Sequence, residues 1–305
     1  SYSSAASDVY KRQLLILSLY FPVSLIGDDS KNALIESYEN ASYPNKINIV
    51  IKDNIDIKGR VTSAGSLALK DNIADKNAFI IDKLIQANYF ILGKANLSEW
   101  ANFRSEDSVS GWSSYGGQTM HYSDDEFNPC GSSSGSAVAV ATGLVDIAIG
   151  TETNGSISCP SSINGIVGMK PTTGLVSRSG IIPISASQDT AGPMGKNVAI
   201  VAKTLEAISG VDTNDSSTLL IPDDFDFNFT IAVKNKRLDG LRFGLLNSNN
   251  TNQDIVKLHN EIKEIVSSLG GVVIDINDKR IYPDDAEYYI LLYEFRTGLE
   301  EYLYK

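Results

Sequence analysis

Hydrophobic and polar positions recur along the chain with two different periods, and together they predict an α/β fold. Residues 45–57 alternate, with isoleucines on one side and Lys52 on the other, a period of two that is typical of a strand. Residues 77–88 place their apolar side chains at helical spacing, and the apolar run 89–93 follows directly as a buried strand. Strands that alternate with helices in this way indicate βαβ units.

Similar patterns predict the other elements. Helices are expected over residues 30–40, 137–146, 159–168, 197–209, 254–269 and 288–304, and strands over 147–150, 241–246 and 272–276.

Two loops of small residues flank the apolar run 137–149. The first loop contains Ser132 and Ser133, and the second ends in Thr153-Asn154-Gly155-Ser156. Gly/Ser segments are usually flexible linkers, but linkers do not bracket a long apolar run. A phosphate-binding loop would need Gly-Lys-Ser/Thr, which is missing. A glycine before a serine suits a tight turn that aims the hydroxyl into a cleft, with neighbouring N–H groups free to bind an oxyanion.

Composition narrows the classes of function. The chain has 305 residues and a net charge of −11, which argues against nucleic acid as a partner. No run reaches the ~18 apolar residues of a membrane span, which argues against a membrane protein. Two histidines and two cysteines at no ligand spacing predict no metal site. Cys130 and Cys159 form no disulfide framework and are predicted to be small packing residues beside the two loops.

The start of the chain leaves its compartment open. Residues 14–26 are apolar and follow Lys11-Arg12, as in a signal peptide, but Pro22 interrupts them and no cleavage site follows. A buried strand is therefore favoured, and with it the cytoplasm, while secretion stays an alternative. Residues 1–13 are interpreted as a non-native extension.

Four motifs together resemble the amidase signature family, and most closely its peptide amidase type. They are Gly116-Gly-Gln-Thr119, Pro129-Cys-Gly-Ser-Ser-Ser-Gly-Ser136, Gly150-Thr-Glu-Thr-Asn-Gly-Ser-Ile157 and the segment 180–189. The resemblance implies a mixed β-sheet core flanked by helices on both faces. It also implies a single domain over residues 14–305, from which a C-terminal part is missing, because family members normally continue further.

The family's Ser-Ser-Lys set maps onto three residues. A lone lysine on a strand is usually a solvated charge, but Lys52 lies in Ile-Lys-Asp-Asn-Ile, the family's lysine motif, 80 residues before Ser132. The resemblance implies that Ser156 attacks the carbonyl carbon. Ser132, held in a cis peptide, would relay the proton, and Lys52 would act as base. A lysine base must be neutral near pH 7, which requires burial without a carboxylate partner.

Further residues are expected around this set. The N–H groups of Thr153, Asn154, Gly155 and Ser156 would form the oxyanion hole. Ser133 and Thr151 would stand beside the set, with Asn96 or Ser98 supporting it and Tyr115 and Trp112 facing substrate.

The resemblance implies hydrolysis of a carboxamide through a seryl acyl-enzyme, with no cofactor. Ser158 stands where many relatives carry arginine, which favours neutral small-molecule amides or C-terminally amidated peptides. One alternative is a glutamine-hydrolysing amidotransferase of the A type, although Asn154 replaces the glycine of such proteins. The other is an inactive, truncated fragment. The oligomeric state is not predicted.

Overall fold

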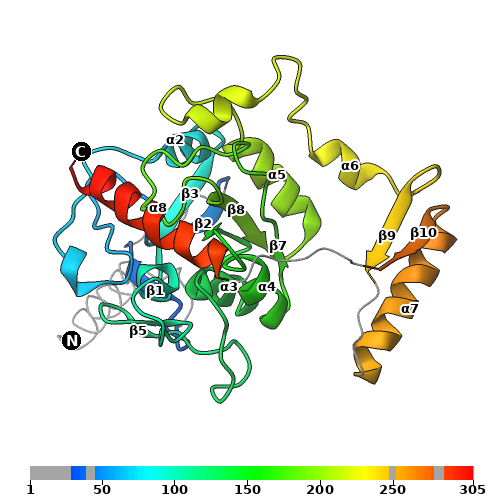
Figure 1. Ribbon diagram of the computed structural model, residues 1–305, viewed down its shortest axis with the longest axis horizontal. Helices are drawn as coiled ribbons and strands as arrows, with labels where there is room; N and C mark the ends of the chain where they lie inside the picture. The colour runs from blue at the N-terminus through cyan, green and yellow to red at the C-terminus, as the bar shows by residue number, and fades with distance from the viewer. Residues whose placement is uncertain (1–28, 39–44, 247–251, 278–284, 305) are drawn as a thin grey trace, which may run out of the picture.

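The computed structural model describes residues 29–38, 45–246, 252–277 and 285–304, and its centre is a six-stranded mixed sheet (Figure 1). The strand order is β1-β3-β2-β6-β8-β7. These strands are β1 (Leu34–Ser37), β2 (Ile47–Lys52), β3 (Tyr89–Ala95), β6 (Ile147–Glu152), β7 (Val167–Gly168) and β8 (Thr190–Gly195). The central strands β3, β2 and β6 run parallel, whereas β1, β8 and β7 join the sheet antiparallel.

Helices cover both faces of this sheet, as the resemblance implied. Ile49 and Ile51 of β2 are fully buried in one cluster with side chains of α2 (Phe79–Gln86) and α5 (Val198–Ile208). Val50 points the other way and packs against α3 (Ser134–Ala141). The alternation along β2 therefore decides which helix each side chain meets, and Lys52 shares the α3 face with Val50.

The carboxyl ends of β2 and β6 lie at the same edge of the sheet, because Ile49 pairs with Ile147 and Ile51 with Ile149. Lys52 is the last residue of β2, and Glu152 is the last residue of β6. The chain leaves β6 through Thr153–Ile157 and enters α4 (Ser158–Ile163). This edge brings both small-residue loops next to Lys52.

Three predicted helices differ from the structure. Residues 34–37 form strand β1 rather than a helix, because they pair with the open edge of β3, and residues 39–40 lie outside the described part. Helix α3 begins three residues before the predicted start and ends at Ala141. Helix α4 ends at Ile163, and residues 167–168 add β7 to the sheet. Backbone hydrogen bonds to a neighbouring strand override local pattern in the first and third cases.

Short elements connect the larger ones. They are the 3-10 turns η1 (Leu67–Leu69), η2 (Glu99–Asn102) and η3 (Ser216–Leu220), the hairpin strands β4 (Trp112–Ser113) and β5 (Gly117–Gln118), and α6 (Thr230–Lys234).

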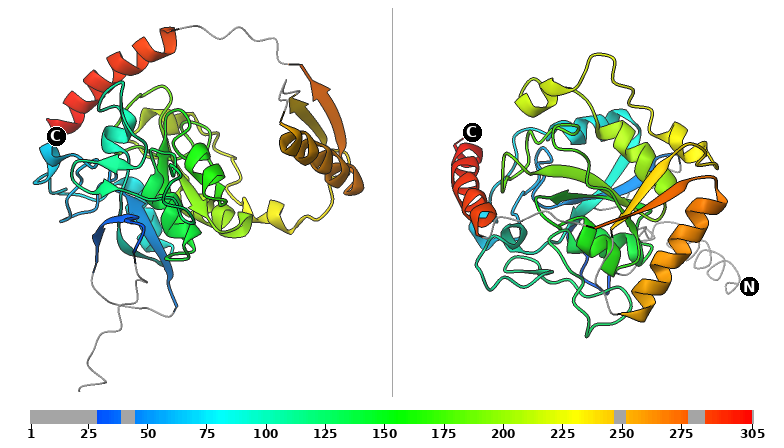
Figure 2. Two further views of the ribbon diagram at one scale, coloured as in Figure 1. Left: turned by 90° about the horizontal axis from the view of Figure 1, so that it is seen from below. Right: turned by 45° about the vertical axis from the view of Figure 1, so that its right-hand side comes forward.

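The last part of the chain forms a small βαβ unit and a long helix. Strands β9 (Arg242–Leu246) and β10 (Val272–Ile276) pair parallel with each other, and α7 (Gln253–Ser268) packs on β10. Figures 1 and 2 show this unit set apart from the main sheet, after which α8 (Ala286–Leu303) returns to the main body. Within the described residues, no helix is long and apolar enough to cross a membrane. Residues 1–26, which carry the signal-peptide pattern, lie outside the described part.

Candidate active site

Lys52 is completely buried, and its amine is surrounded by neutral oxygen atoms. Its Nζ lies 2.8 Å from Ser132 Oγ, 2.9 Å from Thr151 Oγ1 and 3.2 Å from the Thr151 carbonyl oxygen. No carboxylate of the described residues lies within ion-pair distance of this nitrogen. A buried amine among neutral acceptors is easier to deprotonate than one in water.

Burial lowers the pKa of Lys52 to about 7, from an ordinary value of 10.5, while the charges of Asp189 and Glu152 oppose this shift. A pKa near 7 means that a large fraction of the amine is neutral at physiological pH. Three polar neighbours then match the neutral form: two N–H groups can donate to Thr151, and the nitrogen lone pair can accept a proton from Ser132 Oγ.

The loop before α3 holds Ser132 and Ser133 in place. The Gly131–Ser132 peptide bond is cis, as the resemblance implied, and both serines are fully buried. Ser133 Oγ donates to the Thr151 carbonyl oxygen at 3.1 Å and accepts from the Thr151 N–H at 3.2 Å. The Ser133 N–H donates to the carbonyl oxygen of Ser156 at 3.1 Å. The two small-residue loops are therefore joined directly to each other.

Asn96 and Ser98, which were expected to support the site, both contact this loop. The Ser98 N–H donates to the Ser132 carbonyl oxygen at 3.1 Å, and the Asn96 carbonyl oxygen accepts from the Gly135 N–H at 3.0 Å. The segment that follows β3 therefore braces both the loop and the start of α3.

The turn from Thr153 to Ser156 presents its backbone to the site. Gly155 has a φ of 87°, a left-handed conformation that favours glycine. The N–H groups of Asn154, Gly155 and Ser156 have no acceptor among the described residues. Glu152 fixes the far end of the turn, because its carboxylate accepts from the N–H groups of Ile157 and Ser158 at 2.6 and 2.8 Å.

A cavity of about 260 Å³ opens onto this turn. Its polar end is lined by Ser132, Thr151, Thr153, Ser156 and Asn54. Its apolar wall is the segment 181–184, and residues of α8 complete the lining. The cavity therefore combines the serines of both loops with room for a substrate of moderate size.

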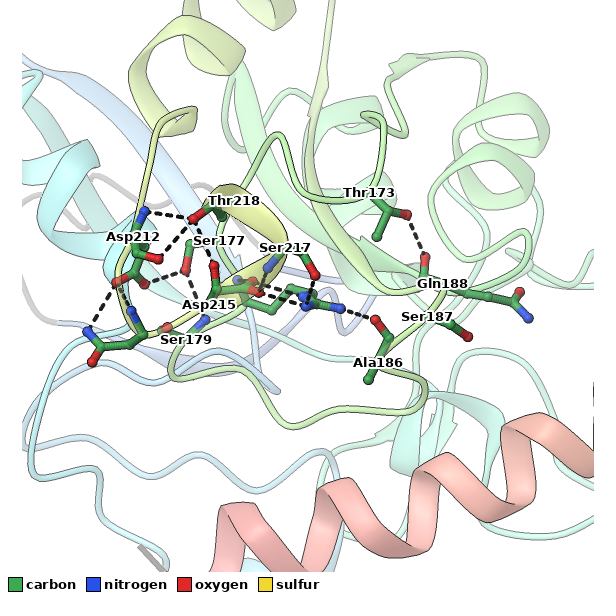
Figure 3. Close-up of polar contacts among 12 residues, drawn as sticks. Thr173, Ser177, Ser179, Ala186, Ser187, Gln188, Asp212, Asp215, Ser217 and Thr218 are labelled. Atoms are coloured by element: carbon green, nitrogen blue, oxygen red, sulfur yellow. Dashed lines mark hydrogen bonds and ion pairs between the residues drawn. The ribbon is translucent and has the colours of Figure 1, made fainter. Parts of the chain in front are cut away.

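A second polar cluster supports the cavity wall (Figure 3). Arg178, which lines the cavity, donates to both carboxylate oxygens of Asp215 at 2.7 and 2.9 Å and to the Ala186 carbonyl oxygen. Asp212 accepts from Ser177 Oγ at 2.6 Å in the same cluster. The hydrogen bonds and charge of Asp215 raise the pKa of Arg178 above its ordinary value. The guanidinium is therefore charged and already paired with a carboxylate of the protein.

Helix α8 closes the cavity from outside and is held at three points. Glu287 accepts from Asn154 Nδ2 at 3.2 Å, near the start of the helix. Glu294 accepts from the hydroxyl groups of Ser185 and Ser187. Tyr302 donates to Asp56 at 2.7 Å, near the end of the helix. Each point lies on a different loop around the cavity.

The structure brings together most of the predicted site residues, but not all of them. Lys52, Ser132, Ser133, Thr151 and the turn 153–156 converge, whereas Tyr115 is exposed and Trp112 stacks beside Arg104, both outside the cavity lining.

Asn54, Arg178 and Glu294 line the cavity and were not predicted. Asn54 belongs to the lysine motif, which was a usable signal. No sequence signal pointed to Arg178 or Glu294, because both are far from Lys52 in sequence and lie in none of the motifs that suggested catalysis.

The prediction for the two cysteines was wrong. Cys130 and Cys159 form a disulfide, with Cα atoms 6.0 Å apart across a separation of 29 residues. Cys130 precedes Ser132 by two residues, and Cys159 follows Ser156 by three. The prediction failed because spacing in sequence does not show that the two loops meet. Disulfides persist mainly in oxidising compartments, so this bond favours secretion over the cytoplasm.

Known proteins similar to this chain exist both in sequence and in structure. The model of the Amidase family matches residues 40–303. A protein named probable amidase from Arabidopsis thaliana is 38% identical over 262 residues, which cover 84% of this chain and 50% of that protein. The X-ray structure of the peptide amidase from Stenotrophomonas maltophilia has a TM-score of 0.81 and 42% identity, covering 90% of this chain and 60% of that one.

The A-type component of the glutamyl-tRNA(Gln) amidotransferase from Thermotoga maritima is less similar in structure. Its TM-score is 0.70 at 28% identity, covering 90% of this chain and 66% of that one. The chain spans about half the length of the curated relatives it matches.

Proposed function

Because the chain belongs to the amidase family, we propose that it hydrolyses a carboxamide C–N bond, with Ser156 as nucleophile, Ser132 as proton relay and Lys52 as base. One observation carries the proposal: the Nζ of Lys52 is fully buried, 2.8 Å from Ser132 Oγ, with only neutral hydrogen-bond partners. Ser132 and Ser156 line the same cavity, which supports a proton relay that runs from Ser156 through Ser132 to Lys52.

The reaction begins with two proton transfers. Neutral Lys52 takes the proton of Ser132, which takes the proton of Ser156, while Ser156 Oγ bonds to the substrate carbonyl carbon. Negative charge collects on the carbonyl oxygen, where the N–H groups of the 153–156 turn stabilise it. Ser132 then gives its proton to the departing nitrogen and regains one from protonated Lys52, and ammonia or an amine leaves.

Water completes the cycle. The same relay removes a proton from water, which attacks the acyl-enzyme, and returns that proton to Ser156 as it leaves. The product is a carboxylic acid, which loses its own proton to solvent and becomes a carboxylate. One water is consumed for each amide bond cleaved, and both catalytic serines and Lys52 return to their starting protonation states.

The substrate is a neutral small-molecule amide or a C-terminally amidated peptide. Ser158 carries no charge, and Arg178 is already paired with Asp215, so the described lining offers no free cation to a substrate carboxylate. The apolar segment 181–184 suits an uncharged side chain next to the amide.

The test combines turnover with active-site labelling. The purified chain is incubated with simple carboxamides and amidated dipeptides, and ammonia release is measured beside fluorophosphonate labelling. Ser156→Ala should lose both signals. Labelling that persists at another serine would reassign the nucleophile. Ammonia release from glutamine that appears only after the other amidotransferase components are added would favour the amidotransferase function.

A further inference from the structure

Asp189 stands at the junction between the oxyanion turn and the cavity wall. It directly precedes β8, whose first residue Thr190 pairs with Glu152 at the end of β6. The antiparallel register therefore brings Asp189 beside Thr153, the first residue of the turn. Neither residue's side chain is used in the proton transfers described above.

The Asp189 carboxylate holds two segments at once. One oxygen accepts from the Thr153 hydroxyl at 2.5 Å. The other accepts from the N–H groups of Ile184 and Ser185 at 2.7 and 2.9 Å. Ile184 lines the apolar wall, and Ser185 in turn donates to Glu294 of α8. Hydrogen bonds to an ionised carboxylate are among the stronger ones in proteins, so this link is well suited to fix a loop.

We propose that Asp189 is a positioning residue for amide hydrolysis, whose carboxylate sets the oxyanion turn against the substrate wall through the hydroxyl of Thr153. This inference rests on the proposed function. Small displacements of groups that bind the transition state have large effects on rate, because a shift of about 1 Å can cost roughly 100-fold. Asp189 acts through Thr153 and the backbone and does not exchange protons with the substrate.

The charge of Asp189 also acts on the pKa of Lys52. This charge and that of Glu152 raise the pKa of Lys52 against the larger effect of burial. Burial raises the pKa of Asp189 itself, and hydrogen bonds from Thr153, Ile184 and Ser185 together with the charge of Arg178 lower it. Glu294 on α8 also lies beside this wall, where it accepts from Ser185 and Ser187, and Glu301 of the same helix lines the cavity. Removing the Asp189 charge should therefore move the ionisation of Lys52 to lower pH.

Two substitutions separate positioning from charge. Asp189→Asn removes the charge and one of the two acceptor oxygens, whereas Thr153→Val removes only the hydroxyl and keeps the charge. We expect each to lower kcat roughly 10- to 100-fold with little change in KM, because the loss falls on the transition state. Only Asp189→Asn should also shift the acidic limb of the pH–rate profile to lower pH. Thr153→Ser, which keeps the hydroxyl, should restore the rate.

The double variant and a matched control complete the experiment. If Asp189 acts through Thr153, the losses of Asp189→Asn and Thr153→Val should not add in the double variant. Asp146→Asn is the control, because Asp146 is an exposed carboxylate just before β6, at the end of that strand opposite Glu152 and outside the cavity lining. It should leave both kcat and the pH limb unchanged. Additive losses, or a wild-type rate and profile in Asp189→Asn, would overturn the proposal.

A second readout keeps this inference separate from the proposed function. The rate and pH dependence of fluorophosphonate labelling report on the turn and on Lys52 without any amide turnover. If wild type labels at Ser156 but releases no ammonia, the proposed function fails, and slower labelling in both variants would still support the role of Asp189. If wild type turns over amides and the variants match it, the role of Asp189 fails alone. Should Asp189→Asn not fold, Thr153→Val and Thr153→Ser decide the outcome.

Discussion

At the scale of single residues, the sheet buries two lysines in different surroundings. Lys94 forms a 3.0 Å ion pair with Asp53, and both side chains are almost completely buried. Lys52, on the other face, meets only hydroxyl and carbonyl oxygens. The first arrangement stabilises an ammonium, and the second disfavours it. Strand β3 thus supplies Lys94 for a structural ion pair, and the neighbouring strand β2 supplies Lys52 as a candidate base.

The pH dependence of catalysis should follow from this difference. The base must be neutral, and the pKa of Lys52 is about 7, so kcat/KM should rise with pH and reach half its plateau near pH 7. Lys52→Ala should lower kcat/KM by about three orders of magnitude or more and abolish this limb. A variant that keeps the limb near pH 7 would remove Lys52 from the mechanism.

The same burial should make stability depend on pH. The pKa of Lys52 is about 7 in the fold and 10.5 in the unfolded chain, so the unfolded chain binds an extra proton between these values. The free energy of unfolding should therefore rise with pH across this window, by about 5 kcal/mol if the whole difference is realised.

Substitution of each lysine by methionine tests how that lysine makes the free energy of unfolding depend on pH. Lys52→Met should be more stable than wild type in urea unfolding at pH 6, with an advantage that shrinks toward pH 10. Lys94→Met should be less stable by about 3–5 kcal/mol at both values, because it leaves Asp53 buried without its partner. If the free energy of unfolding changed with pH in the same way in wild type and Lys52→Met, Lys52 would not be a neutral amine in the folded protein.

At the scale of elements, the two serine loops are tied together by the Cys130–Cys159 disulfide as well as by hydrogen bonds. The bond closes a loop of 29 residues, which by chain entropy stabilises the fold by about 3–4 kcal/mol. We expect reduction with dithiothreitol to lower the melting temperature and to free two thiols for alkylation. The Cys130→Ser/Cys159→Ser variant should melt at this lower temperature with or without reductant. A wild type that titrates two free thiols before reduction would exclude the bond.

Helix α8 is held on the cavity by polar contacts whose loss can be measured locally. Tyr302→Phe removes the hydrogen bond to Asp56 and should weaken docking of α8 by about 1 kcal/mol. Hydrogen exchange of residues 286–303 should then be faster, with α3 unchanged. Tyr304→Phe is the matched control, because Tyr304 is highly exposed. Equal exchange of α8 in both variants would show that the Asp56 contact does not hold the helix.

At the scale of the whole molecule, the βαβ unit of β9, α7 and β10 is separate from the main six-stranded sheet (Figure 2). Its strands pair only with each other among the described residues, and several apolar side chains of α7 are exposed. A unit with few contacts to its neighbour can unfold on its own.

We therefore expect two transitions in calorimetry. Phe243→Ala, in β9, should lower only the midpoint temperature of the first transition. Ile149→Ala, in the buried sheet core, should lower the midpoint temperature of the second. Fluorophosphonate labelling of Ser156 should survive the first transition. A single transition that both variants shift equally would show that the unit and the sheet unfold together.

The sequence by itself determined the class of fold, the presence of strands β2, β3 and β6, and the residues that could carry chemistry. Local pattern was sufficient there because a strand with Ile47, Ile49 and Ile51 on one face can bury them in only one way. The Gly/Ser motifs similarly pointed to Ser132 and Ser156, since the backbone of such loops needs those residue types. Strand β1 was missed because an edge pairing, not its own pattern, stabilises it.

Only the tertiary structure decided which of these residues meet. The neutral surroundings of Lys52, the Cys130–Cys159 bond and the contact of Asp189 with Thr153 all join segments far apart in sequence. Helix α8 reaches Asp56 across 246 residues, and no local pattern contains that information. Proton affinity and loop geometry depend on burial and on distances in space, and these exist only after the chain has folded.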